Sequence, residues 1–540
     1  MSIKDTIMSI FPEESSLPSE VQLKEINQRQ YLAGGRLREW KGPVQDVLSP
    51  VCLKTKNGAA RKKIGSYPLC TEKESEEVLQ AAVAAWDCGR GEWPCMGLEK
   101  RIRCIEDFAF KMKEKREIVV NLIMWEIGKT RKDSEKEFDR TLQYIYDTIE
   151  AVKDMDRASS RFSIEEGIIA QIRRAPLGVV LCMGPYNYPL NETYTTLIPA
   201  LIMGNTAIFK PPKYGVLLHQ PLLEAFAECF PKGVVNTIYG EGTKIIPPIM
   251  ASGKVDVLAF IGSSKVADIL KHQHPQPHRL RSILGLGAKN AGIVLADADM
   301  ELAVKECVTG SLSYNGQRCT ALKILFVHKS RIDEFLTMFT AELLKLKCGM
   351  PWDADVALTP LPEGGKCEYL DSVVKDATAL GAKIINADGG VFNNTFFYPA
   401  LLYPVNEKMR AYHEEQFGPV IPVASFENIE EPLNYVVDSA FGQQLSIFGT
   451  DPDCISDLID PLVNQVCRLN INSQCQRGPD VFPFTGRKDS AEGTLSVSDA
   501  LRCFAIRTLV AAKSSDVNKK ILTGMVRERK SSFLSTDFIF

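Results

Sequence analysis

The stretch Leu177-Gly-Val-Val-Leu-Cys-Met183 is a continuous apolar run that ends in Gly184-Pro185. A run of this length is typical of a strand buried on both faces of a parallel sheet. A helical pattern over 192–203 follows it, and Thr206-Ala-Ile-Phe209 predicts the next strand. This β-α-β succession indicates a doubly wound sheet, in which ligands bind at the carboxyl ends of the strands.

The alternation continues toward the C-terminus. It predicts helices over 217–230 and 243–250 and strands over 234–238 and 257–261. A second alternating set begins near Ala291-Gly-Ile-Val-Leu295 and indicates a second α/β domain. Two further segments, 163–174 and 502–510, have strand patterns outside these domains. We therefore expect an α/β fold with two doubly wound domains and a small bridging β-sheet.

Composition excludes several classes of protein. The 540 residues are 45% hydrophobic and carry 64 basic against 67 acidic side chains, a formal charge of −3, which is typical of an ordinary globular protein. The near-neutral charge and intermixed signs predict no nucleic-acid partner. No apolar run reaches the roughly 18 residues that a membrane helix needs, so no membrane partner is expected. The N-terminus lacks a secretory or transit pattern, which favours a cytoplasmic location.

The strongest local signal is Tyr314-Asn-Gly-Gln-Arg-Cys319-Thr320, placed between a predicted helix and a predicted strand. The fifteen cysteines are odd in number and include no Cys-x-x-Cys pair, so they encode neither a disulfide framework nor a zinc site. One interpretation of Cys319 is therefore a reactive thiol. A thiol beside an arginine can form the thiolate that attacks a carbonyl carbon. The alternative is a buried cysteine that acts as a small apolar residue.

A second motif, Gly184-Pro-Tyr-Asn187-Tyr-Pro189, follows the first strand of the sheet. The Asn187 amide there can donate a hydrogen bond to the oxyanion that forms when a thiolate adds to an aldehyde, with the Cys319 backbone N–H as a second donor. The alternative is an ordinary loop, which the two prolines also favour.

Three more segments complete a set: Phe209-Lys210-Pro-Pro212, Glu414-Glu415-Gln-Phe417-Gly-Pro419 and Asn472-Ser-Gln-Cys-Gln-Arg477-Gly-Pro-Asp480. Together with the two motifs above, they show that the sequence resembles the aldehyde dehydrogenase superfamily over residues 40–512. Within it, the sequence is most similar to the NADP-dependent non-phosphorylating glyceraldehyde-3-phosphate dehydrogenases. The resemblance implies oxidation of glyceraldehyde 3-phosphate to 3-phosphoglycerate with NADP, or with NAD as the alternative, through a thioester on Cys319.

The resemblance also implies roles for individual residues. Cys319 is the expected nucleophile, and Asn187 is the expected oxyanion donor. The expected cofactor-binding residues are Pro185, Lys210, Lys213, Gly262, Ser263, Glu415 and Phe417. The positions that match the branch's phosphate site are Arg140, Tyr188, Arg318 and Arg477. Guanidinium groups suit a phosphate because they donate two aligned hydrogen bonds to its oxygens.

The sequence departs from the family at the general base. The family's Glu-Leu-Gly-Gly-Lys segment reads Leu284-Gly285-Leu286-Gly287-Ala288-Lys289, so Gly285 occupies the position of the glutamate that activates the hydrolytic water. The cofactor loop differs too, with Ile261 and Ala267 in place of a hydroxyl residue and a glycine. Two functions remain open: a dehydrogenase with impaired deacylation, and a catalytically inactive protein of the same fold with a structural or ligand-sensing role.

The implied organisation has five parts. We expect an N-terminal extension over 1–25, a cofactor-binding domain over 26–159 and 176–284, a bridging and oligomerisation sheet over 160–175 and 500–513, a catalytic domain over 285–499 and a C-terminal extension over 514–540. The polar tail favours partial disorder. The expected partners are a small phosphorylated aldehyde, further copies of the chain in a homodimer or homotetramer, and a protein bound through the terminal extensions. His272, His274 and His278 predict an exposed polar loop, and no metal site is expected.

Overall fold

A computed structural model describes residues 2–539, and its first large sheet begins with the apolar run quoted above. The run forms β8 (Val179–Met183), all five of whose residues are buried. The sheet has the strand order β10-β9-β8-β11-β12-β26, and every pairing is parallel except that of β26 with β12. The other strands are β9 (Thr206–Lys210), β10 (Val235–Thr237), β11 (Val257–Ile261), β12 (Arg281–Gly285) and β26 (Ala491–Glu492).

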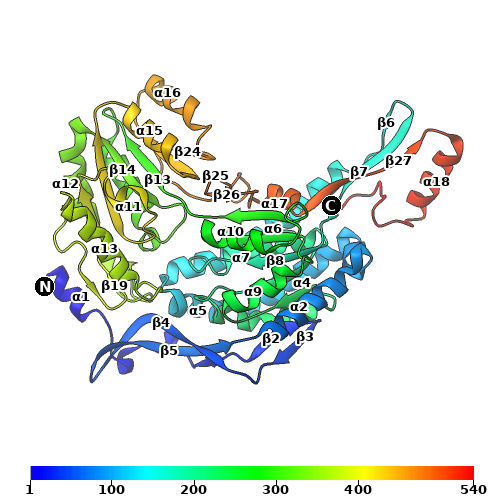
Figure 1. Cartoon of the computed structure of the whole chain (residues 1–540), viewed down its shortest axis with the longest axis horizontal. Helices are drawn as coiled ribbons and strands as arrows, with labels where there is room; N and C mark the ends of the chain where they lie inside the picture. The colour runs from blue at the N-terminus through cyan, green and yellow to red at the C-terminus, as the bar shows by residue number, and fades with distance from the viewer. Residues whose placement is uncertain (1, 540) are drawn as a thin grey trace.

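The second sheet has the order β17-β20-β21-β14-β13-β23-β24 and lies in the other half of the molecule (Figure 1). Its strands are β13 (Asn290–Val294), β14 (Leu322–His328), β17 (Lys383–Ile384), β20 (Ala400–Tyr403), β21 (Val420–Phe426), β23 (Gln444–Phe448) and β24 (Arg468–Ile471). Helices such as α11 (Met300–Leu312) and α12 (Ile332–Leu343) connect the parallel strands. The predicted fold class is confirmed.

Helices cover the first sheet. α7 (Asn191–Ile202) is buried along its whole length, because it lies between β8 and the long α6 (Arg131–Ala158). α5 (Arg116–Ile127) packs on α6 and on the N-terminal hairpin of β4 (Val44–Thr55) and β5 (Gly58–Pro68). At the N-terminus, α1 (Ile3–Ser9) contacts the second half of the chain, and Asn393 Nδ2 donates to the Ile7 carbonyl at 3.0 Å.

The bridging sheet forms an arm that projects from the body (Figure 1). It pairs β27 (Ala505–Lys513) with β7 (Ile168–Pro176), and β7 with β6 (Ser163–Glu165), all antiparallel. The prediction of one strand over 163–174 is wrong, because Glu166 and Gly167 have φ angles of 46° and 76° and turn the chain into a hairpin. The late strand also begins later than predicted, because α17 (Val497–Cys503) precedes it.

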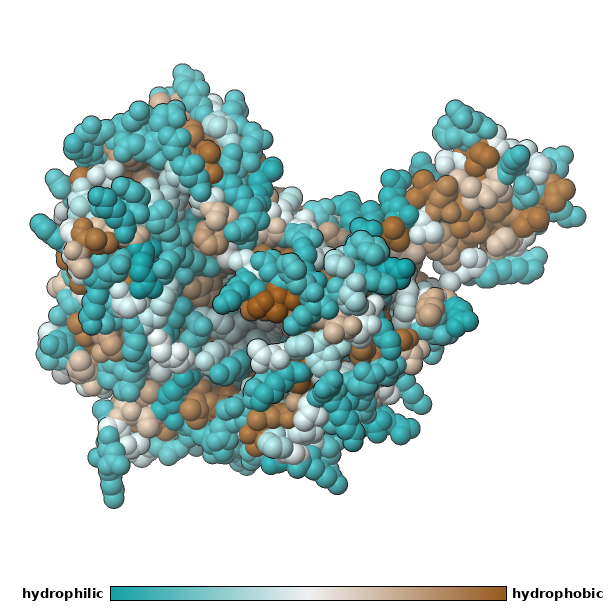
Figure 2. All heavy atoms as spheres, viewed as in Figure 1, coloured by the Kyte–Doolittle hydropathy of each residue, from teal (hydrophilic) through white to brown (hydrophobic). Residues whose placement is uncertain are grey.

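The prediction of a partly disordered tail is wrong as well. Residues 516–527 form α18 (Asp516–Arg527), whose N-terminus is capped by the Ser515 side chain. The chain then returns to the arm, where Leu534 is buried and Gln171 Nε2 donates to the Ser535 carbonyl at 2.6 Å. Apolar side chains gather on this arm (Figure 2), among them Val517, which is 69% exposed.

The histidine segment is only partly the exposed loop that was predicted. His274 is 2% exposed, and its Nδ1 accepts a hydrogen bond from the Gln276 backbone N–H at 3.1 Å. It lies at the end of α10 (Ser264–Gln273), and its Nε2 is 3.1 Å from the Val255 carbonyl oxygen, so backbone groups on both sides hold the ring. Across residues 2–539, no helix combines the length and the apolar character that a membrane crossing requires.

Candidate active site

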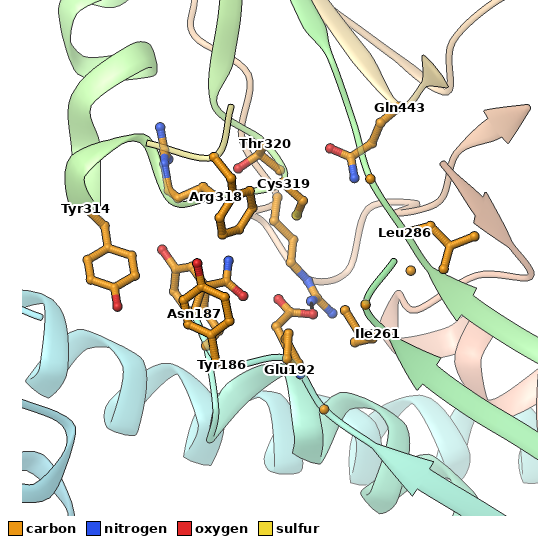
Figure 3. Close-up of a pocket in the computed structure, with 18 of the residues that line it drawn as sticks. Tyr186, Asn187, Glu192, Ile261, Leu286, Tyr314, Arg318, Cys319, Thr320 and Gln443 are labelled. Carbon is orange, nitrogen blue, oxygen red and sulfur yellow. Dashed lines mark ion pairs between the residues drawn. The ribbon is translucent and has the colours of Figure 1, made fainter. Parts of the chain in front are cut away.

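A cavity of about 1090 Å³ lies between the two sheets (Figure 3). The first sheet borders it with the segments that follow β8, β11 and β12 at their carboxyl ends. The second sheet borders it from the opposite edge, because Cys319 and Gln443 come just before β14 and β23. Of the predicted site residues, the lining includes Arg140, Pro185, Asn187, Tyr188, Lys213, Gly262, Ser263, Arg318, Cys319, Glu415, Phe417 and Arg477.

The loop that carries Cys319 is held in one orientation by its backbone carbonyl. The Cys319 oxygen accepts hydrogen bonds from Asn290 Nδ2 at 2.8 Å and from Lys323 Nζ at 3.0 Å. The preceding turn places Tyr314 and Asn315 at φ angles of 50° and 54°, a left-handed conformation that suits asparagine better than tyrosine. The thiol is partly exposed to the cavity.

The electrostatic surroundings of Cys319 disfavour the thiolate in the free protein. Burial raises the pKa of the thiol, and the negative charge of Glu192 raises it further. Lys323 and Arg477 act in the opposite direction, but the net pKa of Cys319 remains above its usual value. Glu192 was not predicted as a site residue, but it lies in the first turn of α7 and lines the same cavity.

Asn187 is placed by a buried ion pair that sequence reasoning missed. Lys129 Nζ donates to the Asn187 carbonyl at 2.8 Å and to Glu137 Oε2 at 2.5 Å, and both charged side chains are fully buried. Glu137 Oε1 accepts from the backbone N–H groups of Leu190 and Asn191 at the start of α7. The Asn187 amide therefore points at the Cys319 loop, where its Nδ2 donates to the Gln317 carbonyl at 2.8 Å.

The arginines of the predicted phosphate site differ in their partners. Arg140 makes two hydrogen bonds to the Asp480 carboxylate, both 2.7 Å long. Arg477 forms ion pairs with Glu192 and Asp480. Burial acts to raise the pKa of Asp480, but the bonds from Arg140 and the charge of Arg477 outweigh it, so the net pKa is lowered. Two carboxylates thus compensate two of the arginines.

Arg318 differs from this pair. Its Nη2 contacts only neutral acceptors, among them the Gly310 carbonyl at 3.0 Å and Gln474 Oε1 at 3.3 Å. Its Nε is buried and has no hydrogen-bond partner within residues 2–539. A buried charged donor without a partner is costly, so this guanidinium is the one best placed to take an anion.

Glu415 and Phe417, two of the residues expected to hold the cofactor, line the cavity near Lys323. Lys323 Nζ contacts Glu415 Oε1 at 2.6 Å and lies 5.6 Å from the centre of the Phe417 ring. A Cβ atom at Gly287 would lie 2.8 Å from Glu415 Oε2, so a larger residue there would displace the Glu415 carboxylate. Lys323 therefore links the carboxylate expected to bind a ribose to the carbonyl of Cys319.

The loop after β11 begins α10 with Ser263 as its N-cap residue, whose Oγ accepts from the Val266 backbone N–H. Gly262, Ser263 and Lys213 line the cavity. Ala267 is buried in the core and is absent from the residues that line the cavity, so its methyl group does not narrow the entrance to the site. Ile261, by contrast, faces the cavity (Figure 3).

Lys210 does not line the cavity, although it was predicted to bind the cofactor. Its Cε lies 3.7 Å from the position of a Cβ at Gly242, the first residue of α9 (Gly242–Ala251). Its Nζ donates to the Pro211 carbonyl, and within the described residues it has no ion-pair partner. Burial lowers the pKa of Lys210 to about 8. An ammonium group without a counter-ion beside a helix N-terminus fits a phosphorylated ligand.

Gly285 is the residue expected at the position of the general base, and it has no side chain to accept a proton. A Cβ atom at this residue would lie 3.4 Å from Ile261 Cγ1 and 3.5 Å from Leu495 Cδ1, which are ordinary van der Waals distances. Packing therefore does not demand glycine here. The side of the cavity next to Gly285 is lined by the apolar side chains of Ile261 and Leu495.

Comparisons with known proteins identify the family of the chain. The family model described as "Aldehyde dehydrogenase family" matches residues 49–509. The NADP-dependent glyceraldehyde-3-phosphate dehydrogenase of Streptococcus equinus is 32% identical over 486 residues, covering 88% of this chain and 96% of that protein. The Arabidopsis thaliana protein of the same name is 32% identical over 454 residues, covering 82% of this chain and 88% of its own.

A solved structure is similar over nearly the whole chain. It is the NADP-dependent glyceraldehyde-3-phosphate dehydrogenase from Bacillus halodurans C-125, complexed with NADP, with a TM-score of 0.82 and 29% identity. The match covers 91% of this chain and all of that structure. The cavity, its cysteine and its asparagine thus occur in a chain that belongs to the aldehyde dehydrogenase family.

Proposed function

We propose that this protein oxidises a small phosphorylated aldehyde, glyceraldehyde 3-phosphate, with NADP through a thioester on Cys319. The observation that carries the proposal is the convergence of Cys319, Asn187 and the arginines in one cavity. The dehydrogenases to which the chain is similar carry this activity in their names. The Cys319 sulfur attacks the aldehyde carbon, and the oxyanion accepts hydrogen bonds from Asn187 Nδ2 and the Cys319 backbone N–H.

The residues at the other end of the cavity suit NADP. Glu415 is positioned by Lys323 to accept from a ribose hydroxyl. Lys213, in the cavity lining, and Lys210, next to the first residue of α9, supply positive charge for a 2′-phosphate. When bound, NADP⁺ supplies the acceptor for the hydride of the aldehyde carbon. Hydrolysis then breaks the thioester and releases the acid. Gly285 offers no base for this step, so we expect deacylation to be slower than the thioester-forming step.

Binding of NADP⁺ should weaken as the pH rises through 8. Because the pKa of Lys210 in the free protein is lowered to about 8, its ammonium is present below this pH and is lost above it. A site that needs the charge then loses affinity by up to about tenfold per pH unit. Titration calorimetry between pH 7 and 9.5 measures the Kd. The Lys210→Met variant should show a flat profile, and an unchanged slope in that variant would contradict the role of Lys210.

Replacement of Arg318 by leucine should raise the KM for glyceraldehyde 3-phosphate by about tenfold or more, because a hydrogen bond to a charged group contributes about 1.5–3 kcal/mol. The KM for unphosphorylated glyceraldehyde serves as the control and should change by less than about threefold. Equal increases for both substrates would mean that Arg318 only shapes the Cys319 loop. Initial rates at saturating NADP⁺ provide the measurement.

The second candidate is a catalytically inactive protein of the same fold, which the absence of a carboxylate at Gly285 favours. Stopped-flow mixing with NADP⁺ and glyceraldehyde 3-phosphate separates the two. A burst of about one equivalent of NADPH per chain, with an acyl adduct on Cys319 in the intact mass, supports the dehydrogenase. Neither burst nor adduct would support the inactive protein.

We also propose that copies of the chain associate through the arm. Leu509 on β27 and Ile164 on β6 are exposed, and Val517 and Ile521 on α18 extend the apolar surface (Figure 2). Exposed apolar surface of this kind marks an interaction site. The association produces a homodimer or homotetramer in which the C-terminal extension takes part.

A further inference from the structure

Glu192 is a cavity carboxylate without a role in the reaction steps proposed above. It is 7% exposed, lines the cavity, and raises the pKa of the Cys319 thiol by its charge. A carboxylate beside a nucleophilic thiol disfavours the thiolate, so its position is a disadvantage for the first chemical step. Once Cys319 is acylated, the sulfur carries no charge and the repulsion ends.

Contacts through Arg477 and Leu495 connect Glu192 with the side of the cavity where Gly285 lies. Glu192 Oε2 contacts the Arg477 guanidinium, and Arg477 Nη2 donates to the Leu495 carbonyl at 3.2 Å. The Leu495 side chain in turn lies 3.5 Å from the position of a Cβ at Gly285. Glu192, Arg477 and Leu495 therefore form one continuous chain of contacts that ends at Gly285. In Figure 3, Glu192 and Ile261 lie on the side of the cavity opposite Thr320.

We propose that Glu192 is the general base for hydrolysis of the Cys319 thioester, in place of the carboxylate that Gly285 lacks. This inference rests on the proposed function for its thioester. Glu192 takes a proton from a water molecule, the water oxygen bonds to the acyl carbon, and the bond from carbon to sulfur breaks. The acid leaves, and the proton passes from Glu192 to the Cys319 sulfur or to solvent. Atoms and charge balance without any further reactant.

The ester 4-nitrophenyl acetate tests the step without any cofactor. Cys319 attacks the ester, nitrophenolate leaves and reports acylation, and water must then hydrolyse the acetyl thioester. We expect the Glu192→Gln variant to release one equivalent of nitrophenolate per active site and then to turn over about 100-fold or more slowly than wild type, because general-base catalysis contributes about 10²–10⁴-fold. Intact mass should show the acetyl group on Cys319.

Three comparisons test whether Glu192 acts as a general base or only supports the structure of the cavity. Glu192→Asp keeps a carboxylate and should turn over faster than Glu192→Gln. Hydroxylamine, which needs no base to attack a thioester, should restore release in Glu192→Gln. The matched control is Glu363→Gln, a cavity carboxylate that accepts from Tyr186 Oη at 2.7 Å, and it should hydrolyse the ester as wild type does.

The pH dependence of acylation gives an independent readout. Because the charge of Glu192 raises the pKa of Cys319, its removal should shift the pH profile of the first turnover, and of alkylation by iodoacetamide, to lower pH. Steady-state turnover of Glu192→Gln within about threefold of wild type, or loss of its first turnover, would overturn the inference. If the wild-type protein does not hydrolyse the ester at Cys319, that result would overturn the proposed function itself.

Discussion

Gly285→Glu, introduced into the Glu192→Gln variant, is expected to raise the steady-state rate of ester hydrolysis by about 100-fold. The new carboxylate would stand at the family's general-base position and take over from the one removed at 192. In the wild-type background we expect a smaller gain, because one base already serves the water. The amplitude of the nitrophenolate burst should stay the same in both backgrounds, because acylation of Cys319 needs no carboxylate at position 285.

The geometry at Gly285 permits this exchange. The residue ends β12, and a Cβ there meets Ile261 and Leu495 only at ordinary contact distances. In the parent variant, Arg477 loses the charge of its Glu192 partner but keeps its hydrogen bond to the Leu495 carbonyl. The site therefore has room for a glutamate at 285 beside the apolar side chains of Ile261 and Leu495.

Gly285→Gln in the same parent variant is the matched control, because it adds almost the same volume without a proton acceptor. A rate that rises equally with glutamine and glutamate would show that filling the space, rather than proton transfer, restores turnover. Thermal unfolding of each variant checks that both side chains are accommodated. A glutamate variant that folds like its parent and gains nothing over glutamine would contradict a general-base role at position 285.

The sequence predicted the two sheets well because their strands are buried on both faces and consist of short apolar runs. The apolar run 177–183, for example, contains β8, which begins two residues after the start of the run and ends with it. The sequence also predicted cavity residues such as Cys319 and Asn187, because these residues lie in motifs with a specific chemistry. Lys210 is the exception, because a motif match cannot tell whether a side chain reaches the cavity or lies behind it.

Other features depend on contacts between distant segments and leave no local pattern. Glu192 lies 285 residues before its partner Arg477, and Lys129 stands in a segment that resembles a charged surface loop. The arm hairpin was predicted as one strand, because Glu166-Gly167 interrupts the apolar pattern only briefly. The tail was predicted to be disordered, although burial of Leu534 orders its return to the arm.

Glu137→Ala should destabilise the protein by about 3–5 kcal/mol, because it leaves the ammonium of Lys129 buried without a counter-charge. The variant also removes the acceptor of the Leu190 and Asn191 backbone N–H groups, so the first turn of α7 loses its cap. The Asn187 loop is tied to the same pair through Lys129, and we expect the first turnover of the ester to slow in parallel. Urea unfolding at fixed protein concentration measures the change in stability.

Two comparisons test whether the loss of stability comes from the buried ion pair of Lys129 and Glu137. Glu135→Ala removes a carboxylate from the same helix outside this pair and should change stability by less than about 0.5 kcal/mol. Lys129→Met combined with Glu137→Gln removes both charges but keeps an amide oxygen for the α7 N–H groups, so most of the stability should return. If the double variant were as unstable as Glu137→Ala, the missing charge balance would not be the cause. If stability returned without the first turnover, Lys129 would be needed to position Asn187 beyond its part in folding.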